Sequence, residues 1–159
     1  MILDNLTRLV AAQAFSSSGA VTTNSLPLKL AGREIGAGEP LAMVFTVTTA
    51  AAIAGTETYL FRAQTATNAD GTTGAVIVAT TPTYTVSSAT FANRNDVLGV
   101  GTIVVLPIPP GSIATITATH LAGFVVVGSS GTISCNVDII PLSHVEESTK
   151  KYLSGRTFG

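Results

Sequence analysis

The chain is short of charge. Only 11% of its 159 residues are Asp, Glu, Lys or Arg, against roughly 25% in typical soluble domains. Residues 17–142 carry ten charged side chains, and the net charge of the whole chain is −1. A soluble monomer normally keeps a well-charged surface. The shortage therefore indicates either a surface that another subunit covers or one that Thr and Ser hydroxyls keep soluble.

Other absences argue against whole classes of protein. Cys135 is the single cysteine, so no disulfide can form within the chain. There is no basic cluster, which argues against nucleic-acid binding. No apolar run reaches the ~18 residues of a membrane helix, and the opening Met1-Ile2-Leu3-Asp4 lacks the cationic region of a secretory signal. We therefore expect neither a nucleic-acid partner nor a membrane partner.

What the chain has instead is the composition of a β-protein. Hydrophobic residues make up 46% of it, with many β-branched side chains that fit a pleated surface and with Gly and Pro at the turns. Short alternating runs separated by turn signals predict about eight short strands. This number favours a jelly-roll-like antiparallel β-sandwich, so we predict an all-β fold.

Strict alternation along these runs predicts which side chains face the core. Cys135 shares a face with Ile133 and Val137, so we expect a buried, structural thiol. The residues expected on one face are Leu41, Met43, Phe45 and Val47 in the first strong run and Tyr59, Phe61, Ala63 and Thr65 in the second, with Leu60, Arg62, Gln64 and Ala66 opposite.

The two ends differ from this body. We divide the chain into an N-terminal arm or short helix (1–16), a β-sandwich (17–142) and a charged tail (143–159). The first segment needs a surface to cover it, which is its own sandwich, a sister subunit or another protein. The tail holds five of the 17 charges, four of them in helical i,i+4 pairs, and is either a short helix or disordered. The apolar residues with helical spacing in the first segment are Ile2, Leu3, Leu6, Leu9, Val10 and Phe15.

Groups that carry chemistry are few and scattered. His120 and His144 are far apart in the sequence, and neither has a metal-ligand partner at short spacing. A catalytic site needs several polar groups that converge, and no motif brings them together. We therefore expect no catalytic residue, no cofactor and no metal, and we predict that the chain is not an enzyme.

Two segments carry a likeness to a known family. The first is Arg33-Glu34-Ile35-Gly36-Ala37-Gly38-Glu39-Pro40-Leu41, followed by Val44, Val47, Thr48 and Thr49. The second is Leu106-Pro107-Ile108-Pro109-Pro110-Gly111, a proline-glycine turn before a long strand. With the opening Met1-Ile2-Leu3-Asp4, Gln13-Ala14 and Thr23-Asn24, these segments resemble the jelly-roll capsid cement (decoration) proteins of tailed bacteriophages. The likeness covers most of residues 1–140, although Ala11 stands where that family has an acidic residue.

The resemblance implies a structural virion protein, made in the bacterial host cytoplasm, on the outer surface of an icosahedral phage head. There it would clamp neighbouring copies of the major capsid protein. We also expect a homo-oligomer, a dimer or a trimer, because edge strands and a sparsely charged surface need cover. The residues expected to contact the capsid or a sister subunit are Leu3, Leu6, Leu9, Phe15, Glu39 and Tyr152.

Two alternative functions stay open. A head fibre or tail component of a phage would share the Thr-, Gly- and Ala-rich β composition. A carbohydrate-binding module is the other alternative, although such modules usually expose aromatic rings. This chain has no Trp, and only 6% of its residues are aromatic.

Overall fold

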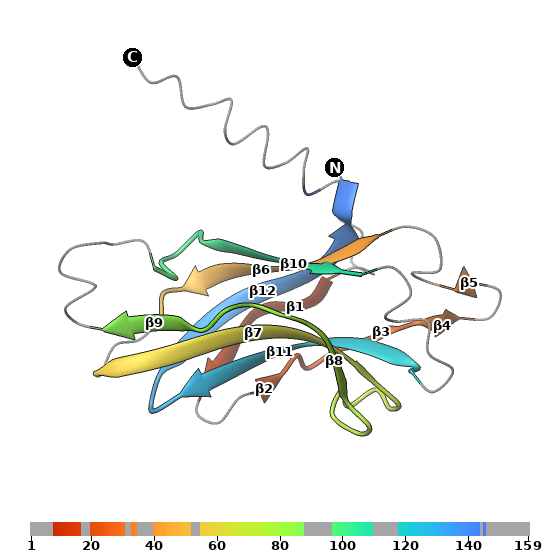
Figure 1. The fold of residues 1–159 in the computed structure, drawn as a ribbon, viewed down its shortest axis with the longest axis horizontal. Helices are drawn as coiled ribbons and strands as arrows, with labels where there is room; N and C mark the ends of the chain where they lie inside the picture. Colours follow the sequence, from red (N-terminus) through yellow and green to blue (C-terminus); the bar gives the residue numbers. More distant parts are fainter. Residues whose placement is uncertain are drawn as a thin grey trace, which may run out of the picture.

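The computed structural model describes residues 8–16, 20–30, 33–34, 40–51, 55–87, 97–109, 118–143 and 145. Figure 1 shows the strands that these residues form. In chain order they are β1 (Arg8–Ser16), β2 (Ala20–Val21), β3 (Leu26–Pro27), β4 (Lys29–Leu30), β5 (Arg33–Glu34), β6 (Leu41–Thr49), β7 (Thr56–Ala66), β8 (Val76–Thr80), β9 (Tyr84–Ser87), β10 (Ile103–Ile108), β11 (His120–Gly128) and β12 (Thr132–Pro141).

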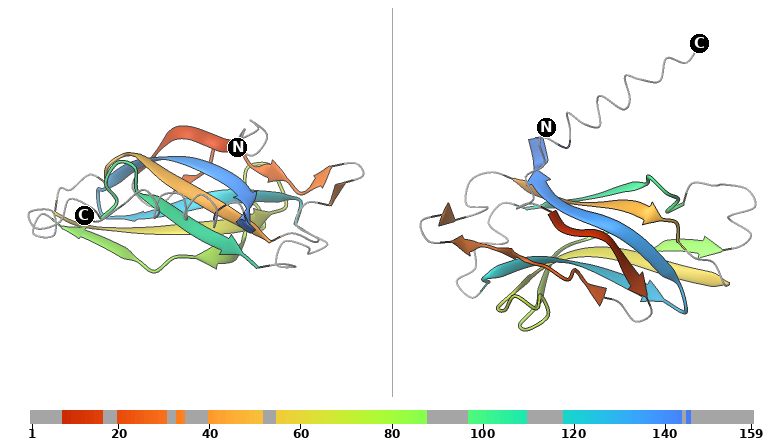
Figure 2. Two further views of the ribbon diagram at one scale, coloured as in Figure 1. Left: turned by 90° about the horizontal axis from the view of Figure 1, so that it is seen from above. Right: turned by 180° about the vertical axis from the view of Figure 1, so that it is seen from behind.

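The strands build two facing sheets, the upper and lower layers of Figure 1. Sheet I has the order β1-β12-β6-β10. Sheet II has the order β2-β11-β7-β8, with β3 also paired to β11 and β9 also paired to β7. Strands β4 and β5 pair with each other in a separate two-stranded sheet. The two further views in Figure 2 show the same two layers, with β1 running beside β12.

The pairing follows the path of a jelly roll. The first half of the chain pairs antiparallel with the second half in reverse order: β1 with β12, β2 and β3 with β11, β6 with β10, and β7 with β8 and β9. This is one long hairpin, and rolling it up adds the pairs β12–β6 and β11–β7. The result confirms the predicted all-β antiparallel sandwich of the jelly-roll type.

The structure has more strands than the eight expected, because two of the eight positions are interrupted and because β4 and β5 form a separate pair. Strands β2 and β3 both lie along β11, and strands β8 and β9 both lie along β7. Pro82 falls between β8 and β9, where a residue without a backbone N–H interrupts a strand. Pro107 lies inside β10, which tolerates it because β10 is an edge strand of sheet I.

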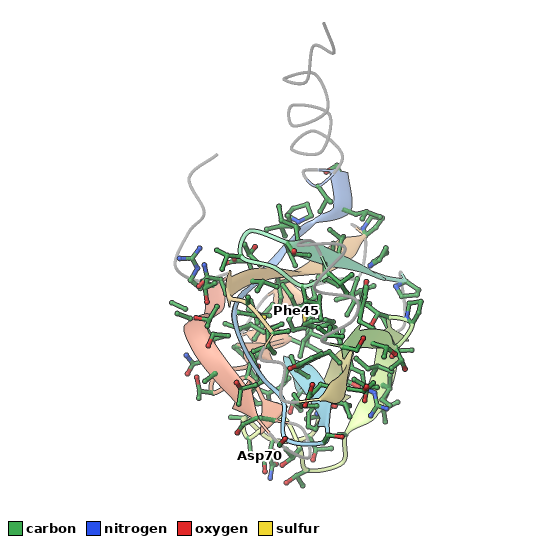
Figure 3. All side chains as sticks on the ribbon, turned by 90° about the vertical axis from the view of Figure 1, so that its left-hand side faces the viewer. Phe45 and Asp70 are labelled. Carbon is green, nitrogen blue, oxygen red and sulfur yellow. The ribbon has the colours of Figure 1, made fainter. Side chains whose placement is uncertain are left out.

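The core lies between the sheets, as Figure 3 shows for Phe45. The ring of Phe61 lies 5.1 Å from that of Phe45 and 5.9 Å from that of Tyr84, in tilted and edge-on arrangements that aromatic pairs favour. The predicted alternation in β6 and β7 is confirmed, since Met43, Phe45 and Val47 and then Tyr59, Phe61 and Ala63 are buried.

The predicted burial of Cys135 is also confirmed. Its side chain lies in the same core as those of Ile133 and Val137. Burial raises the pKa of the Cys135 thiol to about 12, so the thiol stays protonated at neutral pH.

The interpretation of the N-terminal segment as an arm or a helix is wrong for residues 8–16. These residues form β1, which pairs with β12 and belongs to sheet I. Register shifts on both sides of Val10, with Ala12 at φ 49°, break the two-residue period of this strand. Leu9, Val10 and Phe15 therefore all reach the core, with a spacing that resembles that of a helix. Residues 1–7 lie outside the described part of the chain.

The start of the predicted tail follows β12 directly. Leu142 and Ser143 begin a helical turn, and the backbone N–H of Leu142 donates to the carbonyl oxygen of Pro40 at 2.8 Å. Leu142 and Val145 pack against the outer side of sheet I. Residues 146–159 lie outside the described part, so the helical or disordered character of the tail stays a prediction.

Candidate interaction surfaces

The structure places two of the six predicted contact residues inside the protein. Leu9 and Phe15 are 3% and 0% exposed, and both pack in the core between the sheets. This corrects the expectation that they reach out to another subunit, because β1 uses them to fix itself to its own sandwich. Leu3, Leu6, Glu39 and Tyr152 lie outside the described residues.

Apolar side chains nevertheless gather on the outer face of sheet I. Register places Ile140, Ala42 and Pro107 side by side in one row, and Asp138, Val44 and Val105 in the next. This outer cluster is separate from the core. It is closed by the chain itself, because Leu142 and Val145 pack on it and Ala42, Ile140 and Val145 are at most 8% exposed.

Arg8, Asp138 and Asn136 on this face have partners within the fold. Arg8 Nε lies 2.9 Å from Asp138 Oδ1, in an ion pair that joins β1 to β12. Asp138 raises the pKa of Arg8, chiefly through this hydrogen bond. Asn136 Oδ1 accepts a hydrogen bond from the backbone N–H of Ala12 at 2.8 Å. The polar part of the outer face of sheet I thus fixes the irregular strand β1 in place.

Two exposed apolar side chains lie at the β10 edge of sheet I. Val100 is 71% exposed and Ile103 is 51% exposed. The turn before β10 is held by backbone hydrogen bonds from Gly101 to Val47 and from Ala51 to Leu98. These bonds hold Val100 on a fixed turn.

The outer face of sheet II has a different character. Its central row runs from Val21 on β2 through Phe124 on β11 and Arg62 on β7 to Thr80 on β8. Leu60 and Val126 form the next row on one side, and Gln64 and Ile77 lie on the other. Ile77 is 51% exposed, and the side chains of Val21, Leu60, Phe124 and Val126 are half-buried.

Arg62 is the charged group of this row. Two polar side-chain atoms of the described residues are buried without a hydrogen-bond partner, and these are Thr48 Oγ1 and Arg62 Nε. Among the described residues, the ion pair that forms joins Arg8 to Asp138 on sheet I. Arg62 takes no part in it. A buried polar atom without a partner costs free energy, and this cost is larger when the group is charged.

A tight loop closes one end of the outer face of sheet II. Asp70 lies in this loop, at the end of the molecule labelled in Figure 3. Its carboxylate accepts hydrogen bonds from the hydroxyl of Thr73 and from the backbone N–H groups of Thr72 and Thr73. These bonds, with the Thr73 hydroxyl first, lower the pKa of Asp70 to about 2.

Gly71 lets this loop lie directly on the sheet. Its φ is +70°, and a Cβ atom there would lie 2.7 Å from Val21 Cγ2 and 2.8 Å from Ala122 Cβ. Gln64 Nε2 donates to the Gly71 carbonyl oxygen at 2.6 Å. No other residue type fits this close approach with a positive φ without strain.

The remaining chemistry-bearing groups are used in the fold. Glu57 is 1% exposed and lies beside Tyr59, whose hydroxyl donates to the carbonyl oxygen of Thr132 at 3.2 Å. Burial, and then the charge of Glu57, raise the pKa of Tyr59. His120 Nδ1 lies 2.8 Å from the hydroxyl of Thr119, and His144 lies outside the described residues.

Within the ranges described above, no three His, Cys, Asp or Glu side chains gather in a group that could hold a metal ion. The same ranges contain no helix with the length and apolar character needed to cross a membrane.

Alternation in the sequence predicted part of the outer face of sheet II, but it did not predict that this face contacts another protein. Alternation placed Leu60, Arg62 and Gln64 together, opposite Tyr59 and Phe61, and the structure confirms this. What the sequence does not show is that β11 and β2 bring Phe124, Val126 and Val21 next to them. Those strands are more than 30 residues away along the chain from β7, and only the sheet order unites them.

Comparison with known protein families gives a match over most of the described strands. Residues 9–112, more than half of the chain, match the Bbp16 family. The matched region runs from β1 past β10 and includes Leu60 and Arg62, whereas β11 and β12 follow it. No curated protein matches the chain.

Proposed function

The chain belongs to the Bbp16 family, and from this premise and the two outer faces we propose that it is a capsid cement (decoration) protein of a tailed phage. It would bind the outer surface of the icosahedral head and stabilise contacts between neighbouring major capsid proteins. Its likeness to jelly-roll cement proteins, strongest in residues 33–49, supports this proposal together with the jelly-roll strand order.

The observation that carries the proposal is the apolar outer face of sheet II. A free antiparallel sandwich usually turns polar residues to the solvent on its outer faces. Here Leu60, Phe124, Val126 and Ile77 take those positions, on a chain that is poor in charge. Apolar side chains gathered on one face mark an interaction site.

A cement protein can bind a phage head through individually weak contacts. Each head offers many equivalent sites, so many copies act together and avidity replaces a large single interface. A rigid jelly roll needs only one complementary face and no chemistry for this work. We accordingly propose a non-enzymatic protein without cofactor, which fits a thiol that is buried and protonated at Cys135.

We also propose that the protein self-associates as a dimer or a trimer on the head. Among the described strands, β10 lies at an edge of sheet I, and it carries the exposed side chain of Ile103. Such edges are usually covered in native proteins. In a symmetric homo-oligomer, a second copy of the chain covers this edge.

The experiment that tests the function adds purified protein to expanded heads from which the protein is missing. We expect it to sediment with the heads and to raise their resistance to heat, with a saturating number of copies. Isolated tails are the matched control. Binding to tails but not to heads would contradict the cement function and favour the tail-component alternative, and a projecting appendage on the head would favour the fibre.

The carbohydrate-binding alternative receives less support. In the described residues, Phe15, Phe45, Tyr59 and Phe61 are buried, and Tyr84 and Phe124 are half-buried. Sugar-binding sites usually stack the ligand on an exposed ring. A glycan-array screen that gave specific binding would revive this alternative.

A further inference from the structure

We propose that the outer face of sheet II is the surface that docks on the shell, and that Arg62 pairs there with a carboxylate of the partner protein. This inference rests on the proposed cement function and deepens it, since it names the face and the chemistry of its partner.

Arg62 stands in the middle of the outer face of sheet II, between apolar and polar neighbours. Phe124 is its cross-strand neighbour on β11, and Thr80 is its neighbour on β8. Leu60 and Gln64 precede and follow it on the same face of β7 by alternation. Arg62 Nε is buried and has no hydrogen-bond partner in the described part of the chain. A guanidinium stays charged in proteins and offers five donors in a planar fork.

No carboxylate of the described side chains is available to neutralise it. Glu57 is 1% exposed and is paired in register with Val86, whose side chain is in the core. The carboxylate of Asp70 is used by Thr72 and Thr73 within its own loop. Asp138 lies on sheet I and is paired with Arg8. Among the described side chains, Arg62 is therefore a cation without a carboxylate partner, beside Leu60 and Phe124.

A carboxylate is the group that complements this arrangement. The fork of a guanidinium matches the two oxygens of a carboxylate, and the paired hydrogen bonds are about twice as strong as those between neutral groups. Apolar side chains around the pair exclude water once a partner covers them. Central Arg residues with such a ring are typical of the few positions that dominate the affinity of an interface.

The outer face of sheet I is less suited to this role. Leu142 and Val145 already cover its apolar cluster, and its arginine is already paired. Docking there would displace segments of the chain that the fold uses. Docking on sheet II would cover Ile77, Leu60 and Phe124 and would give Arg62 Nε the partner that it lacks.

The test compares three variants of the full chain for binding to expanded heads that lack the protein. Arg62→Gln removes the charge, Arg62→Lys keeps the charge but loses the fork, and Arg8→Gln is the control, which removes an arginine from the opposite face. We expect Arg62→Gln to weaken binding about tenfold or more at low salt. Arg62→Lys should lie between it and the wild type. Arg8→Gln should bind within about twofold of the wild type.

Salt dependence and folding supply the other readouts. Binding by the wild type should weaken as salt rises, and Arg62→Gln should lose much of this dependence, because the screened charge pair is gone. Circular dichroism and the mass of each variant show whether it folds and assembles. Since Arg62→Lys keeps both the charge and the aliphatic stem, it tests the face even where the Gln variant is unstable.

The outcomes separate the two levels of the proposal. If the wild type binds heads and both Arg62 variants bind equally well, the docking face is wrong while the cement function stands. If Arg62→Gln abolishes self-association and leaves head affinity per subunit unchanged, the face is an interface between copies, which also overturns the inference. If the wild type does not bind heads, the cement function fails and the inference fails with it.

Discussion

The outer faces of the two sheets differ in how their apolar and charged side chains are covered and paired. Both carry apolar side chains on the side that turns away from the core. On sheet I the chain covers the cluster around Ile140 with Leu142 and Val145, leaves Ile103 exposed at the β10 edge, and pairs its cation Arg8 with Asp138. On sheet II the apolar side chains are half-buried or exposed, and Arg62 Nε has no partner in the described residues. A face whose cation is ion-paired and whose main apolar cluster is covered supports the fold, whereas a face with an unpaired cation is available to a partner.

The largest expected difference between the faces is in access to solvent. A cysteine replacing Ile77 on sheet II should react with a thiol reagent about 100-fold faster or more than one replacing Ile140 on sheet I, because a covered site reacts only when it opens. Ile77 is 51% exposed and Ile140 is 8% exposed. The rates are measured in the native protein, with Cys135 as an internal control that should stay unlabelled. Equal rates would mean that Leu142 and Val145 do not cover the outer face of sheet I.

Truncation should distinguish the faces by stability. Ile140→Ala should lower the free energy of unfolding by about 2–4 kcal/mol, since it leaves a cavity under Val145. Leu60→Ala on sheet II should cost about 1 kcal/mol, because the side chain is only half-buried. Denaturant unfolding at matched protein concentration measures both. A larger loss for Leu60→Ala would show that the outer face of sheet II is part of the stable core, and the comparison would fail.

Three glycines differ in how closely the fold surrounds them. Gly71→Ala should lower the free energy of unfolding by about 2 kcal/mol, because it combines a positive φ with contacts of 2.7 and 2.8 Å to the outer face of sheet II. Gly101→Ala should cost about 1 kcal/mol, since φ is +86° there but no atom lies within 4 Å. At Gly55 φ is not positive and no atom lies within 4 Å, so Gly55→Ala should leave the free energy of unfolding nearly unchanged. Equal effects at Gly71 and Gly101 would show that the loop does not pack on sheet II.

The smallest effect concerns the carboxylate at the end of sheet II. The pKa of Asp70 is lowered to about 2, from about 3.9 in an unfolded chain. A lowered carboxyl pKa stabilises the fold fully above the unfolded value, and this contribution is lost as the pH falls through the folded value. We expect an NMR titration of the Asp70 carboxyl with a midpoint near 2. Asp70→Asn should weaken the acid dependence of stability below about pH 4. A midpoint near 4 would mean that the Thr72 and Thr73 bonds do not form.

Much of the fold follows from alternation. In β6 and β7 the period of two separates Phe45 and Tyr59 from the solvent side without ambiguity, and it does the same for Cys135 in β12. Pro82 and Pro107 mark an interruption and an edge strand, as their chemistry dictates. Short strands in this number point to a jelly roll, and the structure confirms it.

Two features of the fold could not be predicted from the sequence, for physical reasons. Strand β1 shifts register twice near Val10, so its buried residues lose the period that identifies a strand. The outer face of sheet II is assembled from β2, β7, β8 and β11, and its union depends on the order of strands in the sheet. Alternation shows that a residue such as Leu60 faces away from the core, but it gives no information about which strands lie beside it.

A cryo-electron microscopy reconstruction of the virion tests whether this jelly roll cements a phage head. We expect density for the sandwich at repeated positions on the outer surface of the shell, bridging neighbouring major capsid proteins. Density at the tail, on a projecting fibre or nowhere on the particle would contradict the claim.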